Sequence, residues 1–131
     1  MSEDWSGWIP ILRAADARRS ARFYCDVLGF TKDWEHRVRD GFPLYVQVSR
    51  GPIRLHLSEH EDGGQSTNLC IGVRDVDQVY AEFTGRGLAT EGPPQDQSYG
   101  VRSFGFKDPD GHHLVFSTKL DAFETAPGRT W

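Results

Sequence analysis

The sequence predicts an α+β fold made of two copies of one unit, each a strand, a helix and then further strands. Two observations predict it. In both halves of the chain, apolar residues first recur with helical spacing and then alternate with polar ones. Matching positions of the two halves also keep one constant offset, by which Asp16 corresponds to Asp75 and His56 to Val115. One such unit buries its sheet poorly alone, so we expect the two copies to associate.

The first unit opens with a strand candidate at residues 8–12. Pro10 marks an edge or the start of that strand, because proline has no N–H to donate to a ladder. A helix follows, since Asp16 suits an N-cap and Gly29 suits the stop. The apolar residues of this helix share one face: Ala17, Ala21, Tyr24 and Leu28.

Two strands with strict alternation come next, at residues 44–49 and 53–58. One side of each strand is aliphatic and must be covered, most simply by the helix. The other side carries Tyr45 and Gln47 on the first strand and His56 on the second. This second side is either solvent surface or the wall of a concave site.

The second unit repeats the pattern after a polar linker at residues 59–66. We expect a strand at 69–73, a helix from Asp75 to Gly87, and strands at 99–106 and 112–117 around the turn at 108–111. The prediction is one domain over residues 1–131. Repeat one covers about 7–60, repeat two about 66–118, and a loosely held tail 119–131.

Composition excludes several classes of protein. Hydrophobic residues make up 37% of the chain and no apolar run is long enough to span a membrane. The formal net charge of −4 argues against a nucleic-acid partner. Two cysteines are too few for a disulfide scaffold, and the acidic N-terminus does not resemble a secretory signal. We therefore expect a cytoplasmic protein with neither a membrane nor a nucleic acid as partner.

Two stretches carry a family resemblance. The segments "FYCDVLGF" and "DPDGHHLVF", within the duplicated unit, resemble the vicinal-oxygen-chelate superfamily, whose members include glyoxalase I, extradiol dioxygenases, fosfomycin-resistance enzymes and bleomycin-resistance proteins. The stretch "PLYVQVSRGPIRLHLSEH" resembles its glyoxalase/bleomycin-resistance branch. The resemblance covers about residues 7–118. It implies two βαβββ repeats forming a curved mixed sheet, on a fold that hosts both enzymes and pure binding proteins.

The resemblance also locates the positions that hold a metal in the enzymes. The equivalent residues here are Ile9, His56, Asn68 and Val115, of which only His56 is a good ligand. We therefore expect no metal, no other cofactor and no catalytic residues. The remaining histidines of the loops and turns are expected to be solvated: His60, His112 and His113.

The loss of metal ligands matches the bleomycin-resistance branch, which binds a drug without chemistry. Its members are homodimers that exchange an N-terminal strand around a proline, and Pro10 stands at a matching place. The sequence thus predicts resistance by sequestration of a DNA-damaging drug, bleomycin-type or anthraquinone/enediyne-type, in a dimer-interface crevice. The alternatives are a metal-dependent glyoxalase- or dioxygenase-like enzyme with rearranged ligands, and a metabolite-binding accessory domain.

A crevice for a flat drug needs aromatic rings to stack on the ligand and a few polar groups to orient it. The sequence supplies both kinds of side chain near the polar strand faces. The expected ligand-binding residues are Trp34, Phe42, Tyr45, Gln47, His56, Asn68, Tyr99, Arg102 and Phe104.

Overall fold

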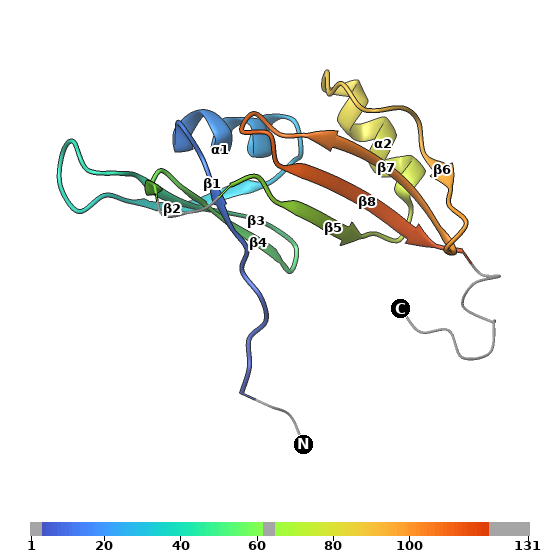
Figure 1. Cartoon of the computed structure of the whole chain (residues 1–131), viewed down its shortest axis with the longest axis horizontal. Helices are drawn as coiled ribbons and strands as arrows, with labels where there is room; N and C mark the ends of the chain where they lie inside the picture. Colours follow the sequence, from blue (N-terminus) through green and yellow to red (C-terminus); the bar gives the residue numbers. More distant parts are fainter. Residues whose placement is uncertain (1–3, 62–64, 121–131) are drawn as a thin grey trace. The chain divides into compact units, whose positions relative to one another are not determined.

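The computed structural model describes residues 4–61 and 65–120, in two compact units spanning residues 1–65 and 66–131. Each unit has its own helix and its own four-stranded sheet (Figure 1). Unit 1 contains β1 (Ile11–Arg13), α1 (Ala17–Asp26), β2 (Thr31–His36), β3 (Tyr45–Arg50) and β4 (Ile53–Ser58). Unit 2 contains β5 (Asn68–Gly72), α2 (Val76–Gly85), β6 (Gln95–Asp96), β7 (Val101–Lys107) and β8 (His113–Lys119).

Both sheets are mixed and have the same topology. Their strand orders are β1-β4-β3-β2 and β5-β8-β7-β6. The first strand of each unit runs parallel to the last, and all other neighbours are antiparallel. Pro10 directly precedes β1, an edge strand, as its missing N–H predicts. The α+β class and the repeated unit are thus confirmed.

The constant offset between the halves recurs in the strand register. Ile11 lies opposite His56 in unit 1, and its counterpart Cys70 lies opposite Val115 in unit 2. The first residues of the two helices, Ala17 and Val76, are related by the same offset. The two units are therefore structural repeats of one another at the level of individual residues.

The helix signals read from the sequence are also confirmed. The Asp16 carboxylate accepts a hydrogen bond from the Arg19 N–H at 3.1 Å, and Asp75 accepts one from the Gln78 N–H at 3.2 Å. Gly29, just beyond α1, has φ of 75°, a conformation in which a Cβ would be strained.

A second contact ties each helix to the end of its own sheet. The Glu59 carboxylate accepts hydrogen bonds from the Ala17 N–H at 2.9 Å and the Leu44 N–H at 3.0 Å. In unit 2 the equivalent residue, Thr118, accepts from the Val76 N–H at 2.9 Å. These bonds satisfy first-turn N–H groups that have no partner within a helix.

Each helix covers one face of its sheet and leaves the other face uncovered within the unit; we call the latter the open face. The covered faces hold the cores. In unit 2 the core is aromatic, with Phe83 at 5.2 Å from Phe116 and 6.3 Å from Phe104 between ring centroids. In unit 1 it is mainly aliphatic, and its buried residues include Leu12, Ala17, Ala21, Tyr24, Leu28, Val46, Val48, Leu55 and Leu57.

Several expectations about local structure need correction. The strand β2 was missed, because Thr31–His36 is polar and mostly exposed and shows no alternation, and β6 was missed because it is only two exposed residues long. The first strand begins at Ile11 rather than at residue 8. His112 is not solvated: it is 1% exposed, and its Nδ1 accepts a hydrogen bond from the Thr67 N–H at 3.0 Å. The position after a turn did not reveal this, since burial of His112 depends on the neighbouring strand β5.

The expected tail falls mostly outside the described residues. Lys119 is the last residue of β8, and residues 121–131 are not described. In the described ranges, no helix combines the length and hydropathy that crossing a membrane requires.

Candidate ligand-binding surfaces

The open face of unit 1 carries a cluster of three rings, which we call the aromatic cluster: Trp34, Tyr45 and His56. The Trp34 and Tyr45 rings are nearly parallel, with 6.1 Å between centroids and 9° between planes. The His56 ring stands edge-on to both, at 5.3 Å from Trp34 and 5.0 Å from Tyr45. Trp34 is 41% exposed, so the cluster presents an aromatic surface on which a flat ligand can stack.

The strand register explains why these rings meet. Tyr45 and Gln47 alternate with buried valines on β3, and Gln47 lies directly opposite His56 on β4. The ladder between β2 and β3 shifts register between Lys32 and Trp34, leaving Asp33 as an extra residue. Such a bulge turns successive side chains toward the same region. It places both Trp34 and Asp33 beside Gln47.

A chain of hydrogen bonds connects the polar atoms of this face. The Tyr45 hydroxyl lies 2.8 Å from His56 Nδ1, and His56 Nε2 lies 3.0 Å from Gln47 Oε1. The Gln47 amide nitrogen in turn donates to Asp33 Oδ2 at 3.0 Å. We call this series from Tyr45 to Asp33 the relay. It holds the Tyr45 and His56 rings of the aromatic cluster in fixed orientations.

The direction of each bond in the relay follows from its Asp33 end. Hydrogen bonds from Gln47 and Ser49 hold the pKa of Asp33 below its usual value, so the carboxylate is ionised and can only accept. Gln47 must therefore turn its NH₂ to Asp33 and its oxygen to His56. It follows that His56 carries its proton on Nε2, and that Tyr45 donates its hydroxyl proton to the bare Nδ1.

His56 is thus held as a neutral imidazole with both nitrogens occupied. Burial, aided by the positive charge of Arg54, lowers its pKa below the ordinary value of 6.5. A metal ligand would need one nitrogen with a free lone pair, and here Nδ1 accepts from Tyr45 while Nε2 carries the proton. This bonding suits His56 to orienting Tyr45 rather than to coordination.

The other positions where the enzymes hold a metal are also accounted for. Ile9 is in the segment before β1, and Val115 is on the open face of β8, where neither aliphatic side chain can coordinate. Asn68, the first residue of β5, is exposed. Over residues 4–61 and 65–120, no three His, Cys, Asp or Glu side chains are grouped in a way that could hold a metal ion.

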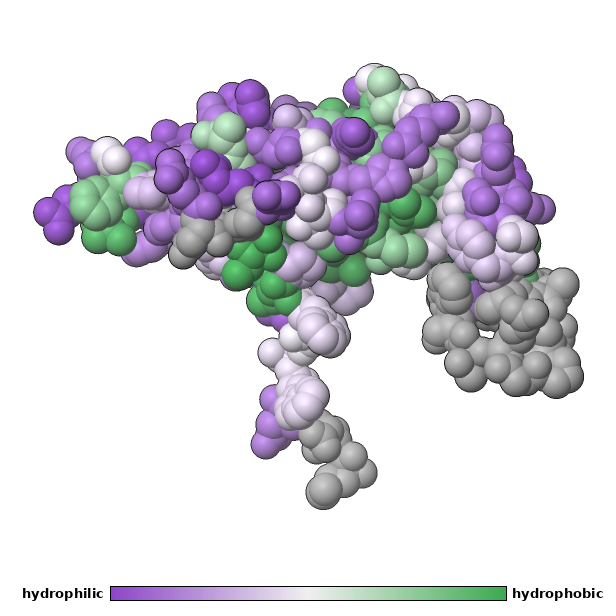
Figure 2. All heavy atoms as spheres, in the orientation of Figure 1, coloured by the Kyte–Doolittle hydropathy of each residue, from purple (hydrophilic) through white to green (hydrophobic). Residues whose placement is uncertain are grey.

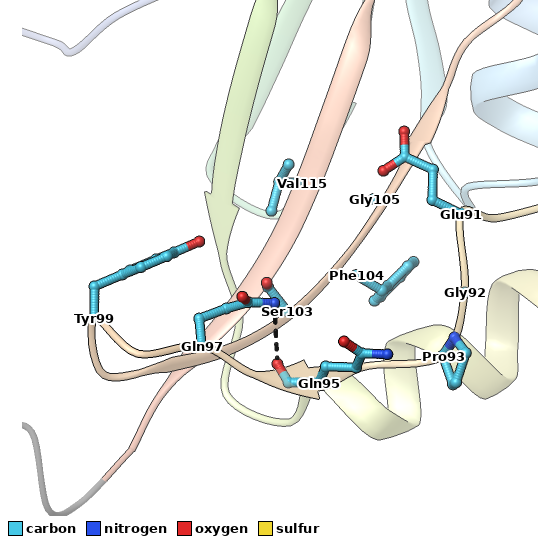
Figure 3. A pocket seen from close by; sticks show the side chains of 10 residues that line it. All are labelled: Glu91, Gly92, Pro93, Gln95, Gln97, Tyr99, Ser103, Phe104, Gly105 and Val115. Atoms are coloured by element: carbon cyan, nitrogen blue, oxygen red, sulfur yellow. Dashed lines mark hydrogen bonds between the residues drawn. The ribbon is translucent and has the colours of Figure 1, made fainter.

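Unit 2 contains a pocket of about 250 Å³ between the open face of β7 and the segment that leads to β6. Tyr99, which is 54% exposed, and Glu91 lie on opposite sides of this pocket in the view of Figure 3. The lining contains no Lys or Arg side chain. Its residues are Glu91, Gly92, Pro93, Gln95, Gln97, Tyr99, Ser103, Phe104, Gly105 and Val115.

Glu91 is positioned in this pocket by a hydrogen-bonded contact with His113 beside a glycine. Its carboxylate lies 2.8 Å from His113 Nε2. A Cβ on Gly105 would come within 2.8 Å of the Glu91 carboxylate and 2.9 Å of His113 Nε2. Because Gly105 has no side chain, the Glu91 and His113 side chains can meet over it.

The remaining expected ligand residues are spread over the two units. Phe42 is 43% exposed in the β2–β3 connection, where the Arg39 guanidinium lies 4.9 Å from the centre of its ring. Phe104 is 4% exposed, and its ring packs edge-on to Tyr80 at 5.2 Å in the core of unit 2. The Phe104 side chain therefore belongs to the packing beneath the pocket.

Arg102 does not lie on the open face. Side chains alternate along β7, so Arg102 shares the helix-covered side with Phe104. Its guanidinium binds Asp77 of α2 at 3.0 Å and Asp96 of β6 at 3.1 Å. The alternation from residue 99 to 106 was available in the sequence, but which of the two sides the helix covers was not.

Sequence reasoning missed several polar residues of these surfaces. Asp33 was missed along with β2, although a carboxylate beside an expected ligand-binding tryptophan was a signal that could have been used. Glu91 precedes the short strand β6, and its pairing with His113 depends on contacts between segments that are separated in the chain. Three further lining residues lay outside the expected set: Gln95, Gln97 and Ser103.

Unit 1 also exposes apolar side chains away from the aromatic cluster. The segment before β1 extends away from the sheet of this unit, and Trp5 and Trp8 on it are 86% and 94% exposed (Figure 1). At the tip of the β2–β3 connection, Figure 2 shows hydrophobic atoms among hydrophilic ones, in keeping with the exposed Val38 and Phe42.

Comparisons with known proteins agree with this picture. The family model described as "Glyoxalase superfamily protein" matches residues 4–122. Proteins named bleomycin resistance protein, from Geobacillus stearothermophilus and Staphylococcus aureus, are 28% identical over 132 residues, covering 86% of this chain and 96% of theirs.

Solved structures show the same similarity. The bleomycin-binding protein from bleomycin-producing Streptomyces verticillus, solved with copper(II)-bleomycin, is 32% identical with a TM-score of 0.67, covering 88% of this chain and 97% of that one. A superfamily member from Sphaerobacter thermophilus shares the fold, with a TM-score of 0.69, 24% identity, and coverage of 85% and 94%. With the repeated βαβββ unit and a family match over residues 4–122, the chain belongs to the glyoxalase/bleomycin-resistance superfamily.

Proposed function

We propose that this protein binds a small aromatic antibiotic and gives resistance by sequestering it, without turnover. The ligand class is that of DNA-damaging drugs, bleomycin-type or anthraquinone/enediyne-type. The observation that carries the proposal is the aromatic cluster on the open face of unit 1, in which the relay fixes the Tyr45 and His56 rings beside Trp34. Rigid, partly exposed rings beside a few polar atoms are the composition of a site for flat ligands.

The relatives support the same reading. The Streptomyces verticillus protein is named as bleomycin-binding and the bacterial relatives as bleomycin resistance proteins. A binding protein needs no catalytic metal, and the residues at the four metal positions suit this role. Three of them offer no strong ligand, and both nitrogens of His56 are bonded to neighbours.

We further propose that the protein acts as a homodimer that exchanges its N-terminal strand, with the ligand in a crevice at the interface. Trp5 and Trp8 are almost fully exposed in the segment before β1, and a second subunit would cover them. Of the expected ligand residues, those that suit such a crevice are Trp34, Phe42, Tyr45, Gln47, His56, Asn68 and Tyr99.

Calorimetric titration tests the function directly. We expect bleomycin or an anthraquinone drug to bind with a Kd in the micromolar range or tighter, and Trp34→Ala to weaken binding at least tenfold by removing a stacking surface. Val38→Ala, another exposed apolar residue of unit 1, serves as the matched control and should bind as the unchanged protein does. No binding tighter than millimolar across both drug classes would refute the proposal.

Metal analysis separates binding from catalysis. We expect the purified protein to contain zinc, nickel, iron and manganese far below one ion per chain, whether His56 is present or replaced by alanine. One ion per chain that is lost in His56→Ala would instead show a metal-dependent enzyme with rearranged ligands.

A further inference from the structure

We propose that the Tyr45 oxygen accepts a hydrogen bond from the ligand, so that the aromatic cluster selects rings carrying a hydroxyl or amino group over rings that can only accept. This inference rests on the proposed function and narrows its ligand class. It follows from the direction of the relay, which commits the one hydroxyl proton of Tyr45 to His56.

The relay opposes any reversal of the hydrogen bond from the Tyr45 hydroxyl to His56 Nδ1. If the hydroxyl turned to donate to a ligand, His56 Nδ1 would lose its partner, and the proton on Nε2 would stay committed to Gln47 Oε1 at 3.0 Å. Shifting that proton to Nδ1 would leave Nε2 and Gln47 Oε1 as two facing acceptors. Flipping the Gln47 amide would set its oxygen against the Asp33 carboxylate. As long as His56 is neutral, the form that its lowered pKa favours, every alternative leaves at least one polar contact unsatisfied.

With its proton committed, the Tyr45 oxygen offers a lone pair at the edge of the stacking surface. Tyr45 is half-buried, and its ring is nearly parallel to that of Trp34. A flat ligand stacked on the cluster would bring substituents of its own edge toward this oxygen. A phenolic O–H or an aryl N–H can bond there, whereas an ether or ketone oxygen would face another acceptor.

The donors near the cluster do not change this conclusion. Arg54, on the same face of β4, donates to the Ser6 carbonyl oxygen at 3.2 Å. The indole N–H of Trp34 is a second donor within the cluster, and the His60 ring lies edge-on to that of Tyr45 at 6.2 Å. A ligand acceptor could use any of these groups, but none of them takes part in the bond between Tyr45 and His56. Selection at Tyr45 is therefore measurable as a difference in affinity between probes that differ only in whether they can donate a hydrogen bond.

The experiment titrates ¹⁵N-labelled protein with 2-naphthol, 2-methoxynaphthalene and 2-ethylnaphthalene, and follows the Trp34 indole signal. The methyl ether matches the ethyl compound in size and 2-naphthol in its oxygen, but it cannot donate. We expect 2-naphthol to bind roughly fivefold more tightly than the ether, the effect of one neutral hydrogen bond. The ether and the ethyl compound should bind alike.

Three variants test whether Tyr45 causes the difference in affinity between 2-naphthol and the ether. Tyr45→Phe should bring 2-naphthol and the ether to equal affinity. His56→Leu should also bring the ratio of the two affinities, 2-naphthol over the ether, toward one. Without His56, the Tyr45 hydroxyl is free to donate to the ether oxygen. Tyr80→Phe, which removes the hydroxyl of a tyrosine on α2 that packs against Phe104, is the control and should keep the ratio.

Each outcome has a distinct meaning. Equal binding of 2-naphthol and the ether by the unchanged protein, or a ratio that persists in Tyr45→Phe, overturns this inference and leaves drug binding standing. Absence of binding by all three probes at the Trp34 signal overturns both the inference and the proposal that the cluster holds aromatic rings.

Discussion

The His56 imidazole lies between Tyr45 and Gln47, and these two contacts define what the residue can do. It is the only one of the four metal positions with a side chain that binds metals well. Its bonds place the proton on Nε2 and use the lone pair of Nδ1. A residue type that suggests coordination therefore acts in this protein as the support of a tyrosine.

The lowered pKa of His56 predicts a pH dependence of stability. In the unfolded chain His56 takes up a proton near its ordinary pKa of 6.5, while the folded protein resists protonation to a lower pH. Between the two pKa values the unfolded state binds more protons, so stability rises with pH there. The contribution of His56 is complete above about pH 6.5 and is lost as the pH falls toward the folded pKa.

Urea denaturation at about pH 5 and about pH 7.5 measures this effect. We expect the fall in unfolding free energy toward the lower pH to be smaller in His56→Gln, a variant with no group that titrates in this range. His36→Gln, on the exposed strand β2, should retain the fall seen in the unchanged protein. An identical pH dependence in His56→Gln would contradict the assignment.

Secondary-structure elements are joined in the same way in both repeats. The residue after β4, Glu59, and its counterpart Thr118 on β8 each bind the first N–H of their own helix. Each makes a second bond: Glu59 accepts one from the Leu44 N–H, and the Thr118 hydroxyl donates one to the Val73 carbonyl oxygen at 2.9 Å. A side chain at the end of the last strand thus fixes where the helix begins relative to the sheet.

These contacts predict similar effects of matched substitutions. Glu59→Leu should lower the unfolding free energy by about 2 kcal/mol, since it leaves two part-buried N–H groups unpaired. Thr118→Val should also lower it by about 2 kcal/mol, because the Val76 N–H and the Val73 carbonyl oxygen each lose a partner. Urea denaturation checks both values, with the exposed Glu61→Leu as a control expected to change little. Equal stability of Glu59→Leu and the unchanged protein would show that these bonds do not hold the helix.

At the scale of the whole molecule, the exposed side chains of the segment before β1 bear on the proposed homodimer. Apolar surface left exposed by one chain is removed from water when a second chain covers it. Trp5 and Trp8 are the most exposed of the large hydrophobic residues in the described part of the chain. Ile11, on the edge strand β1, is 52% exposed next to them.

We therefore expect sedimentation equilibrium to give a mass near twice the 14.8 kDa of the chain. The double substitution Trp5→Ser and Trp8→Ser should shift the equilibrium toward the monomer, since two large aromatic side chains no longer gain from burial. Val38→Ser, at an apolar position 64% exposed in the β2–β3 connection, is the control and should stay dimeric. A monomer mass for the unchanged protein at micromolar concentration would refute strand exchange.

The sequence alone determined the class of fold, the repeat and the first residues of both helices of this protein. These depend on local signals: a capping aspartate, apolar residues at helical spacing, alternation along a strand, and the same signals again at a constant offset in the second half. Asp16 and Asp75 show this, because each caps its own helix through a bond to a first-turn N–H. The grouping of Tyr45, Gln47 and His56 was likewise predictable, since alternation puts them on one side of neighbouring strands.

Tertiary structure alone decided which groups complete the candidate surfaces and which expected residues lie on the helix-covered side instead. The bulge in β2 brings Asp33 to Gln47, and through it sets the tautomer of His56. In unit 2 the helix covers the side of β7 that carries Arg102 and Phe104. These outcomes depend on strand register and on which face a helix covers. Both are settled by packing between residues far apart in the chain, which no local pattern records.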